Sequence, residues 1–431
     1  MKFHTIILGS GPSGLAAALA ASESGANVAV IDDNFTSGGQ IWRGGAHQQK
    51  DPRAQAMWTE LNNRNHVHFY FQNKVIQAQS GTDGYELLIE NTATSEPAFR
   101  LQANSISLCT GARELLLPFP GWTLPGVTGA GGLQALCKNG YPVQGKRIIV
   151  AGTGPLLLAV AATLRERGAI VTHIIEQSPL NQLASFGLKL WATPEKIKQA
   201  LQLGWTLKDS RYWSNSYVVA AQGKETLTQV QVKHGDKVET IPCDMLACGY
   251  GLIPNIEFAA HLQCQLTDEK VYQAVVVDQY QQSSQPNIFC AGEGCGIGGI
   301  DKALAEGRIA GYAASGQTNK AQASFEERKK WRTFARHLHQ YFQLRPELRT
   351  LAQDDTLICR CEDVSLAQLK QHADWRSAKL HTRCGMGACQ GRICGTANRF
   401  LFSWEKDAGR SPVSGALIAS LIKVSDTKVE N

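Results

Sequence analysis

The order of apolar and polar residues near the start of the chain predicts a nucleotide-binding unit. The mostly apolar run 5–8 precedes a Gly-rich loop, an Ala- and Leu-rich stretch then reaches Ser24, and a second apolar run, 28–31, ends at Asp32. A strand, a Gly-rich loop, a helix and a second strand that ends on an acid are typical of dinucleotide binding.

The same order of segments recurs in the middle of the chain. The run 147–150 leads into a second Gly-rich loop and a helical stretch, and the run 171–175 ends before Glu176. Short alternating segments within 66–108 and 205–241 predict further strands. The pattern therefore predicts an α/β chain in which the nucleotide-binding architecture occurs twice.

Size and composition narrow the class of protein. The 431 residues allow two to four domains, and 43% hydrophobic with 19% charged residues is ordinary for a soluble globular protein. The net charge of +6 is modest. Its basic excess lies in the C-terminal quarter of the chain, which favours a solvated surface over an acidic partner.

No basic block indicates nucleic acid, and no apolar stretch reaches the length of about 18 residues that a membrane span needs. The first residues predict a strand rather than a signal peptide, so we expect a cytoplasmic protein with reduced or metal-bound thiols.

The three glycines of the first loop, Gly9, Gly11 and Gly14, each have a physical task. The first permits a tight turn, the second lets the backbone approach a pyrophosphate, and the third lets helix and strand pack closely. The pyrophosphate would lie at the positive end of the helix dipole, and Asp32 could accept hydrogen bonds from a ribose. The alternative is a Gly-rich turn that binds no ligand.

The second loop departs from this pattern. Leu157 stands where the third glycine is expected after Gly152 and Gly154. A leucine there should push the helix away from the strand or fill space that a nucleotide needs. Glu176 nevertheless stands where an acid would favour NAD. Because these clues conflict, the second unit either binds NAD(P), binds another nucleotide, or is a scaffold that binds none.

Cysteines near the C-terminus have a spacing that is hard to explain as core packing. Cys359 and Cys361 form a Cys-x-Cys pair, Cys389 and Cys394 follow in a Gly-rich segment, and Cys384 lies just upstream. Four thiolates on two short loops can hold an iron–sulfur cluster or a zinc ion. Zinc sites prefer Cys-x2–4-Cys spacing, which favours iron and sulfur here. The other cysteines include no Cys-x-x-Cys redox pair, which argues against disulfide reduction.

Three further segments resemble the two-dinucleotide-binding-domain flavoproteins, the fold of thioredoxin reductase and the ferredoxin reductases. They are Ser37-Gly-Gly-Gln40, Cys109-Thr-Gly-Ala112, and Ile288-Phe-Cys-Ala-Gly-Glu293, in which Glu departs from the usual Asp. The resemblance covers residues 1–320 and implies FAD in the first site. The residues that it implies as FAD ligands are Gly9, Gly11, Pro12, Ser13, Gly14, Asp32, Gly39, Gln40, Thr110, Gly111, Gly292 and Glu293.

The segment 382–394, Thr-Arg-Cys-Gly-Met-Gly-Ala-Cys-Gln-Gly-Arg-Ile-Cys, resembles the bacterioferritin-associated-ferredoxin-like [2Fe–2S] domain found fused to FAD enzymes. The resemblance implies that Cys359, Cys361, Cys389 and Cys394 bind the cluster. Fused versions often carry another residue at the position of Cys384, so we expect Cys384 to be a spectator.

The order of the motifs, together with the segment 118–127, resembles the α subunit of heteromeric amino-acid dehydrogenases. This group includes the A subunit of opine oxidase, the α subunits of D-hydroxyproline and proline dehydrogenases, and the flavoprotein subunit of hydrogen cyanide synthase. The resemblance implies that a separate, FAD-containing and amine-oxidase-like β subunit oxidises the amine. Electrons would cross the flavin and cluster of this chain to an acceptor, and no catalytic acid–base set is expected here. The resemblance also allows FMN at a subunit interface and a small ferredoxin-like subunit in a hetero-oligomer.

From these segments we expect an FAD-binding domain at 1–115 plus 244–320, a second Rossmann domain at 116–243, a linker helix at 321–353 and a [2Fe–2S] domain at 354–431. Three other functions stay open. They are a stand-alone NAD(P)H-dependent reductase, a non-redox scaffold subunit of an amine oxidase, and an iron-release factor that uses the cysteine domain alone.

Overall fold

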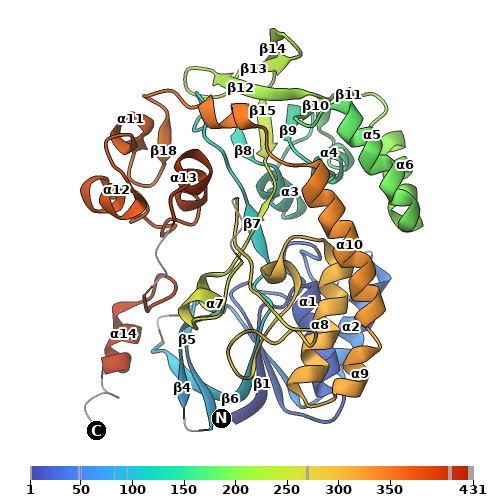
Figure 1. Ribbon diagram of the computed structural model, residues 1–431, viewed down its shortest axis with the longest axis vertical. Coiled ribbons are helices and arrows are strands. Elements are labelled where there is room, and N and C mark those ends of the chain that lie inside the picture. Colours follow the sequence, from blue (N-terminus) through green and yellow to red (C-terminus); the bar gives the residue numbers. More distant parts are fainter. Residues whose placement is uncertain are drawn as a thin grey trace. The chain divides into compact units, whose positions relative to one another are not determined.

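The computed structural model describes residues 2–46, 49, 51–81, 83–94, 96–267, 271–405 and 410–425. The chain forms two compact units, and Figure 1 shows their helices and strands. The first unit consists of Met1–Arg113, Pro254–Ala335 and Ala408–Asn431, and the second consists of Glu114–Ile253 and Arg336–Asp407. Each unit therefore combines stretches that are far apart in the sequence.

The first unit contains one mixed sheet with helices packed on it (Figure 1). Its strands are β1 (Lys2–Leu8), β2 (Val28–Asp32), β3 (Val67–Phe71), β4 (Asn73–Gly81), β5 (Gly84–Asn91), β6 (Phe99–Leu108) and β17 (Ile288–Cys290). Its helices are α1 (Pro12–Ser22), α2 (Pro52–Asn62), α7 (Glu257–His261), the 3-10 helix η2 (Gly292–Cys295), α8 (Ile300–Ala314), α9 (Thr318–Gln322) and α14 (Ile418–Ser425). Helix α10 (Phe325–Tyr341) begins in this unit and ends in the second, and the chain also passes between units within β7 (Ala112–Glu114) and β16 (Leu252–Pro254).

The sheet of the first unit has the strand order β3-β2-β1-β6-β5-β4, and β17 pairs with β6. The strands β1, β2, β3, β6 and β17 pair in parallel, so their carboxyl ends meet at one edge. Both faces are buried, because Ile6, Ile31 and Ile106 lie in one core while Ile7 and Val30 lie in the other. A parallel sheet that is covered on both faces needs apolar residues at successive positions, and this explains the continuous apolar runs in β1 and β2.

Helices α1 and α8 approach each other closely because α8 carries glycine at the contact. A Cβ atom on Gly307 would lie 2.2 Å from the backbone oxygen of Ser13, and one on Gly311 would lie 2.2 Å from that of Ala17. No side chain fits at these distances. The packing therefore holds the N-terminus of α1 in place beside the parallel strands.

The second unit contains a parallel sheet with the order β11-β10-β9-β15-β8 and a separate antiparallel sheet, β12-β13-β14. Its strands are β8 (Val127–Gly129), β9 (Arg147–Gly152), β10 (Ile170–Glu176), β11 (Arg211–Trp213), β12 (Ser216–Gln222), β13 (Gln229–His234), β14 (Lys237–Pro242) and β15 (Met245–Gly249). Its helices before the cysteine region are α3 (Ala130–Lys138), α4 (Leu156–Glu166), α5 (Leu180–Lys189), the 3-10 helix η1 (Leu190–Ala192) and α6 (Pro194–Thr206).

The cysteine region belongs to the second unit. Its elements are the 3-10 helix η3 (Pro346–Thr350), β18 (Leu357–Cys359), β19 (Val364–Ser365), α11 (Leu366–Leu369), α12 (Trp375–Thr382) and α13 (Cys394–Phe402). Ile358, Val364, Leu369 and Trp375 form a small core of their own with the neighbouring cysteines. The indole nitrogen Nε1 of Trp122 donates to the backbone oxygen of Leu357 at 2.7 Å, which joins this core to the rest of the unit.

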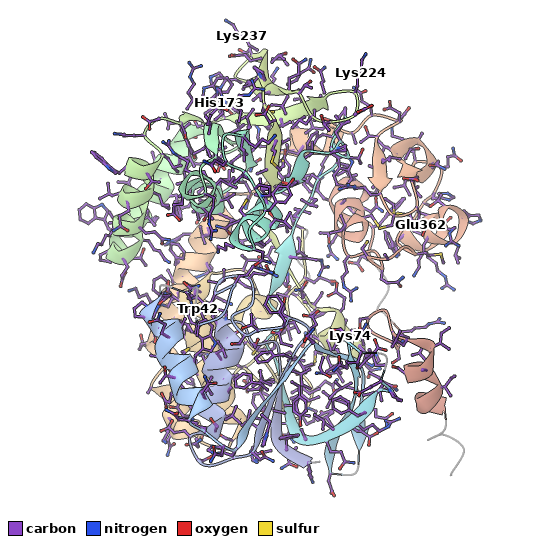
Figure 2. All side chains as sticks on the ribbon, turned by 180° about the vertical axis from the view of Figure 1, so that it is seen from behind. Trp42, Lys74, His173, Lys224, Lys237 and Glu362 are labelled. Carbon is purple, nitrogen blue, oxygen red and sulfur yellow. The ribbon has the colours of Figure 1, made fainter. Side chains whose placement is uncertain are left out.

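The last described residues pack on the sheet of the first unit. The amide of Val413 donates to the backbone oxygen of Ile76 in β4 at 2.9 Å, and that of Leu417 donates to Oε2 of Glu90 in β5 at 2.7 Å. Glu90 also pairs with Nζ of Lys74 at 2.9 Å, and Figure 2 labels Lys74 on this unit. A buried carboxylate thus joins the C-terminal segment to β4 and β5.

The structure confirms the predicted α/β class and its duplicated unit, which appears as β1-α1-β2 and again as β9-α4-β10. One boundary is wrong: the strands predicted from residue 205 begin only at β11, because α6 continues to Thr206. Within the described ranges, every helix is too short or too polar to cross a bilayer.

The contact between α1 and α8 predicts that a substitution at Gly311 destabilises the protein, whereas the same substitution at an exposed helical glycine outside the contact does not. We expect Gly311→Ala to lower the free energy of unfolding by roughly 1–3 kcal/mol, because the added methyl group forces the two helices apart. Gly204 lies exposed in α6, and a Cβ atom there meets nothing within 4 Å. We expect Gly204→Ala to stabilise the protein by about 0.5–1 kcal/mol. Thermal or chemical unfolding measures both changes, and a Gly311→Ala protein as stable as the wild type would contradict the packing described.

Candidate functional site

The first Gly-rich loop connects β1 to the N-terminus of α1, and its three glycines make close backbone contacts. Gly9 has φ of +98°, and a Cβ atom there would lie 2.4 Å from the backbone oxygen of Cys109. A Cβ atom on Gly14 would lie 1.9 Å from the backbone oxygen of Gly9. Gly11 is the N-cap of α1 and has no side-chain cap. Pro12, the first residue of the helix, has no N–H, so the amides available to an anion are those of Ser13 and Gly14.

The loop that contains Gly39 lies against this turn. Gly39 has φ of +58°, and a Cβ atom there would lie 3.0 Å from the Cα atom of Gly11. The amide of Gly38 donates to the backbone oxygen of Ser10 at 2.8 Å. Gln40, beside Gly39, accepts a hydrogen bond from Nη2 of Arg43 at 2.6 Å. Two glycines, Gly11 and Gly39, thus face each other beside the start of α1, and no side chain lies between them.

Asp32 ends β2 and lies next to the first loop. Its Oδ2 accepts hydrogen bonds from the amide and the hydroxyl of Ser10, both at 2.6 Å. Its Oδ1 accepts from the amide and side chain of Asn34 at 2.9 and 2.7 Å. The carboxylate is thereby fixed at the carboxyl end of the strand, where a ribose would approach.

The segment Ile288–Glu293, which we call the late motif, reaches the same edge of the sheet. Gly292 follows β17 with φ of +80°, and a Cβ atom there would lie 2.7 Å from Oγ of Ser13 in α1. Glu293 accepts hydrogen bonds from the amides of Gly298 and Gly299 at 2.7 and 3.0 Å. Burial raises the pKa of the Glu293 carboxyl.

Thr110 and Gly111 follow β6 at this edge. The hydroxyl of Thr110 donates to the backbone oxygen of Asn255 at 2.7 Å, and Nδ2 of Asn255 donates back to the oxygen of Thr110 at 2.9 Å. Because β1, β2, β6 and β17 are parallel neighbours, the predicted FAD residues from four distant segments gather at one sheet edge.

A buried ionic group supports the late motif, and the sequence reasoning missed it. Nζ of Lys302 donates to the backbone oxygens of Gly292 and Gly296, both at 2.9 Å, and to Oε2 of Glu306 at 2.8 Å. Glu306 also accepts from the amide of Gly292 at 3.1 Å and from Nε of Arg332 at 2.9 Å. Burial opposes the charged form of Lys302, yet Glu306 and Glu293 raise its pKa overall. The four-residue spacing of Lys302 and Glu306 was the available signal.

The second Gly-rich loop makes the same tight turn as the first, but a leucine side chain fills the space between the following helix and the sheet. Gly152 has φ of +138°, and a Cβ atom there would lie 1.7 Å from the backbone oxygen of Gly249. Leu157 is buried in the core between α4 and the sheet, together with Val150 and Ile174. Leucine at this position therefore serves as a core residue of the second unit.

A segment of the same unit covers the second loop. The aromatic ring of Phe342 is the nearest group to a Cβ atom built on Gly154, at 3.9 Å. Gln177 donates through Nε2 to the backbone oxygen of Gln343 at 2.8 Å and accepts from the amide of Arg345 at 2.9 Å. We call residues 342–345 the strap.

Glu176 is turned inward under this strap. It accepts hydrogen bonds from the amides of Gly154 and Ser178 at 2.7 and 2.8 Å and from the hydroxyl of Thr153 at 3.2 Å. Only 1% of its surface is exposed, and burial raises the pKa of its carboxyl. Glu176 is therefore held by hydrogen bonds within its own unit, as Asp32 is in the first, and the strap beside Gly154 is what sets the second loop apart.

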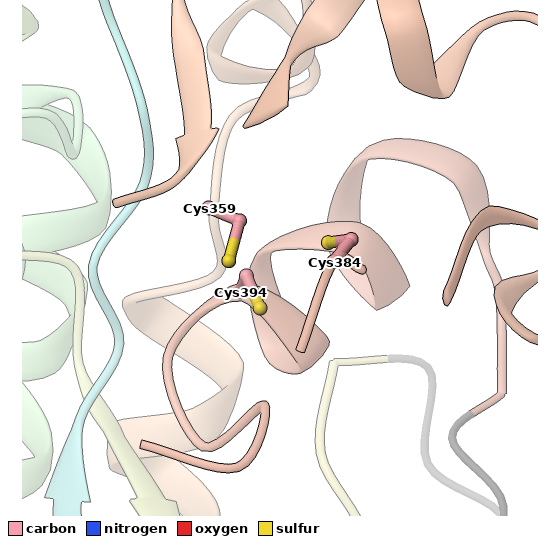
Figure 3. Close-up of side chains that lie close together, drawn as sticks. All are labelled: Cys359, Cys384 and Cys394. Atoms are coloured by element: carbon pink, nitrogen blue, oxygen red, sulfur yellow. The ribbon is translucent and has the colours of Figure 1, made fainter. Parts of the chain in front are cut away.

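Five cysteines gather at the loops between β18 and α13. The sulfur atoms of Cys359, Cys384 and Cys394 all lie within 4.8 Å of one another, and all three residues are buried (Figure 3). Cys361 is exposed and Cys389 is half-buried, and their thiols are hydrogen-bonded to each other. Cys384, expected as a spectator, thus lies beside two of the predicted ligands.

Among the three buried cysteines, hydrogen bonds favour thiolate at Cys359 and raise the pKa of Cys384 and Cys394. The thiols of Cys384 and Cys394 donate to Cys359 and lower its pKa to about 2, while the hydrogen bond to Cys359 raises the pKa of Cys384 to about 12. The amides of Ile393, Gly391 and Arg392 also point at the sulfur of Cys389. Backbone amides that face sulfur stabilise an anionic cluster. The donor set and its surroundings therefore suit iron and sulfur.

Comparisons with known proteins extend this description. Residues 3–307 match the pyridine nucleotide-disulphide oxidoreductase family. The hydrogen cyanide synthase subunit HcnB of Pseudomonas aeruginosa is 30% identical over 91% of this chain and 91% of its own length. The A subunit of opine oxidase from Agrobacterium tumefaciens is 29% identical over 99% of this chain and 92% of its own length. The crystal structure of L-proline dehydrogenase from P. horikoshii shares the fold, with a TM-score of 0.68 at 18% identity over 98% of this chain and 79% of that chain.

The buried ionic group predicts a specific effect of Lys302→Met. Removing the ammonium leaves the carboxylate of Glu306 buried with fewer partners, so we expect a loss of about 3–5 kcal/mol in unfolding free energy. We also expect weaker FAD retention, because Gly292 and Gly296 lose their shared donor. Lys320→Met is the control, since Lys320 forms an exposed ion pair with Glu23, and such pairs contribute about 1 kcal/mol or less. Equal losses in the two variants would contradict this assignment.

The strap predicts that nicotinamide dinucleotides do not reduce this protein. When the flavin-loaded protein is mixed anaerobically with NADH or NADPH, we expect the flavin absorbance to stay unchanged, because the ring of Phe342 lies against Gly154, where a pyrophosphate would have to approach. Dithionite serves as the control that the flavin is reducible. Rapid bleaching by NADH would contradict the prediction and revive the stand-alone reductase.

Proposed function

The chain belongs to the pyridine nucleotide-disulphide oxidoreductase family, and we propose that it is the electron-transferring flavoprotein subunit of a heteromeric amine dehydrogenase. Membership of this family confirms the expected FAD-dependent oxidoreductase. The observation that carries the proposal is the extent of the likeness to HcnB and to the opine oxidase chain. It covers 91% and 99% of this chain, well beyond the end of the family match at residue 307. Both relatives are named as subunits of larger enzymes.

The first site suits FAD in its local chemistry. Gly11 and Gly39 leave a cradle without side chains, and the uncapped start of α1 offers amides to a pyrophosphate. Asp32 is held where it can accept from the adenosine ribose, and Glu293 lies beside the start of α8. We propose that these residues hold the cofactor together with Pro12, Ser13, Gly14, Gln40, Thr110, Gly111, Gly292 and Gly9.

The cysteine cluster suits a [2Fe–2S] centre. We propose that Cys359, Cys361, Cys389 and Cys394 bind it. When bound, the flavin would accept two electrons, and the cluster would accept one electron at a time. The chain contributes rigid binding sites, and its own residues move no proton from the substrate.

The amine is oxidised elsewhere in this proposal. A β subunit with its own FAD removes two electrons, as a hydride, from the carbon next to a primary or secondary amine, which leaves an imine and releases a proton. Electrons then pass to the present chain and on to an acceptor. We further propose FMN at the subunit interface, a small ferredoxin-like subunit, and a cytoplasmic location that keeps the thiolates reduced.

Coexpression with the amine-oxidase-like partner tests this division of labour. We expect the purified complex to contain FAD and iron, and to transfer electrons from an amine to a dye acceptor. Cys389→Ala should abolish dye reduction, because the cluster loses a ligand, while FAD content stays at the wild-type level. Cys137→Ala, at a buried position of α3, is the matched control and should keep both properties.

Full turnover in the Cys389→Ala complex would favour the non-redox scaffold instead. A complex that holds FAD but no iron, and still reduces the dye, would remove the cluster from the proposal.

A further inference from the structure

The five cysteines divide into two groups that differ in burial. Cys359, Cys384 and Cys394 have 1%, 0% and 1% of their surface exposed, and their sulfur atoms lie within 4.8 Å of one another. Cys361 and Cys389 form a hydrogen-bonded pair at the surface. Figure 3 shows the three buried sulfur atoms facing a common space.

This division assigns the ligands to the two irons. A [2Fe–2S] cluster is held by four thiolates, two on each iron. Sulfur atoms that already lie together need the least movement to share an iron. Cys359 and Cys394 would therefore bind a buried iron, and Cys361 and Cys389 a solvent-facing one.

The buried group holds one thiol more than an iron needs. We propose that Cys384 is a reserve ligand for the buried iron, able to take the place of Cys359 or Cys394 when either is lost. The inference rests on the proposed [2Fe–2S] centre. It differs from a packing role, in which the Cys384 thiol would only fill the core beside Trp375 and Ala378.

The surroundings of Cys384 favour a ligand. Nδ2 of Asn398, which is fully buried, donates to its sulfur at 3.5 Å. Gly385 follows with φ of +82°, and Arg383 precedes it in the left-handed conformation, so the thiol stands at a sharp turn. Arg383 also donates to Oε2 of Glu362, the neighbour of Cys361, at 2.7 Å (Figure 2). The loops that carry Cys361 and Cys384 are thus joined.

The solvent-facing iron has no such reserve. Across the residues that the structure describes, the three buried cysteines are the one group of thiol, imidazole or carboxylate ligands close enough to share a metal ion. Loss of Cys361 or Cys389 therefore leaves that iron with a single thiolate.

Alanine variants of the full-length protein, purified anaerobically, test the proposal. Alanine is chosen because a serine hydroxyl could itself bind iron. We expect Cys359→Ala and Cys394→Ala to keep most of the wild-type iron and a [2Fe–2S] absorption spectrum, with shifted g values in the electron paramagnetic resonance spectrum of the reduced protein. Cys361→Ala and Cys389→Ala should lose the cluster. Cys384→Ala alone should keep it, because the four resident ligands are intact.

The double variants Cys359→Ala/Cys384→Ala and Cys394→Ala/Cys384→Ala decide the question, and we expect both to lose the cluster. FAD content and circular dichroism report folding independently of iron. Folded Cys359→Ala and Cys394→Ala proteins with no more iron than Cys361→Ala would overturn the inference, as would double variants that keep the iron of the single ones. A wild-type protein without iron and sulfide would instead refute the proposed cluster itself.

Discussion

Close approach of one backbone to another at glycine is the constraint on which the first site depends. Gly9 and Gly14 let the turn and the helix approach within distances that no side chain allows, and Gly311 does the same between α1 and α8. These contacts fix the start of α1 beside the carboxyl ends of the parallel strands. Asp32, Thr110 and the late motif reach the same edge only because the strands that carry them are neighbours. A cofactor that lies across this edge meets backbone amides, a fixed carboxylate and a buried ionic group.

The second unit repeats the architecture with a different outcome. The turn at Gly152 is as tight as in the first loop, but Leu157 fills the core and the strap lies over Gly154. Glu176 satisfies its oxygens with neighbouring amides. The same strand–loop–helix–strand unit thus leaves its loop open in one half of the chain, where we propose the FAD site, and lies against the chain's own strap in the other.

Those parts of the structure that depend on the spacing of residues close together in the chain could be predicted from the sequence. Apolar runs predicted β1, β2, β9 and β10, and the glycine pattern predicted the two loops, because each involves residues close together in the chain. The strap was not predictable, since Phe342 and Gly154 are brought together only by tertiary packing. The support of Gly292 by Lys302 was missed for a similar reason. A lysine and a glutamate four residues apart occur on many exposed helices, and only burial gives this pair its role. The spacing of the cysteines located the thiolate loops, but it could not reveal that the sulfur atom of Cys384 lies close to those of Cys359 and Cys394.

The chain enters the second unit twice, at Glu114 and at Arg336, and the described residues after 410 belong again to the first. Neither unit is therefore encoded by an uninterrupted stretch of the gene. A recombination event that exchanges one continuous segment carrying the thiolate loops and the terminus also removes the hydrogen bonds that Val413 and Leu417 make with β4 and β5. The cysteine region and the described C-terminal segment therefore cannot be exchanged together as a cassette that leaves the first unit intact.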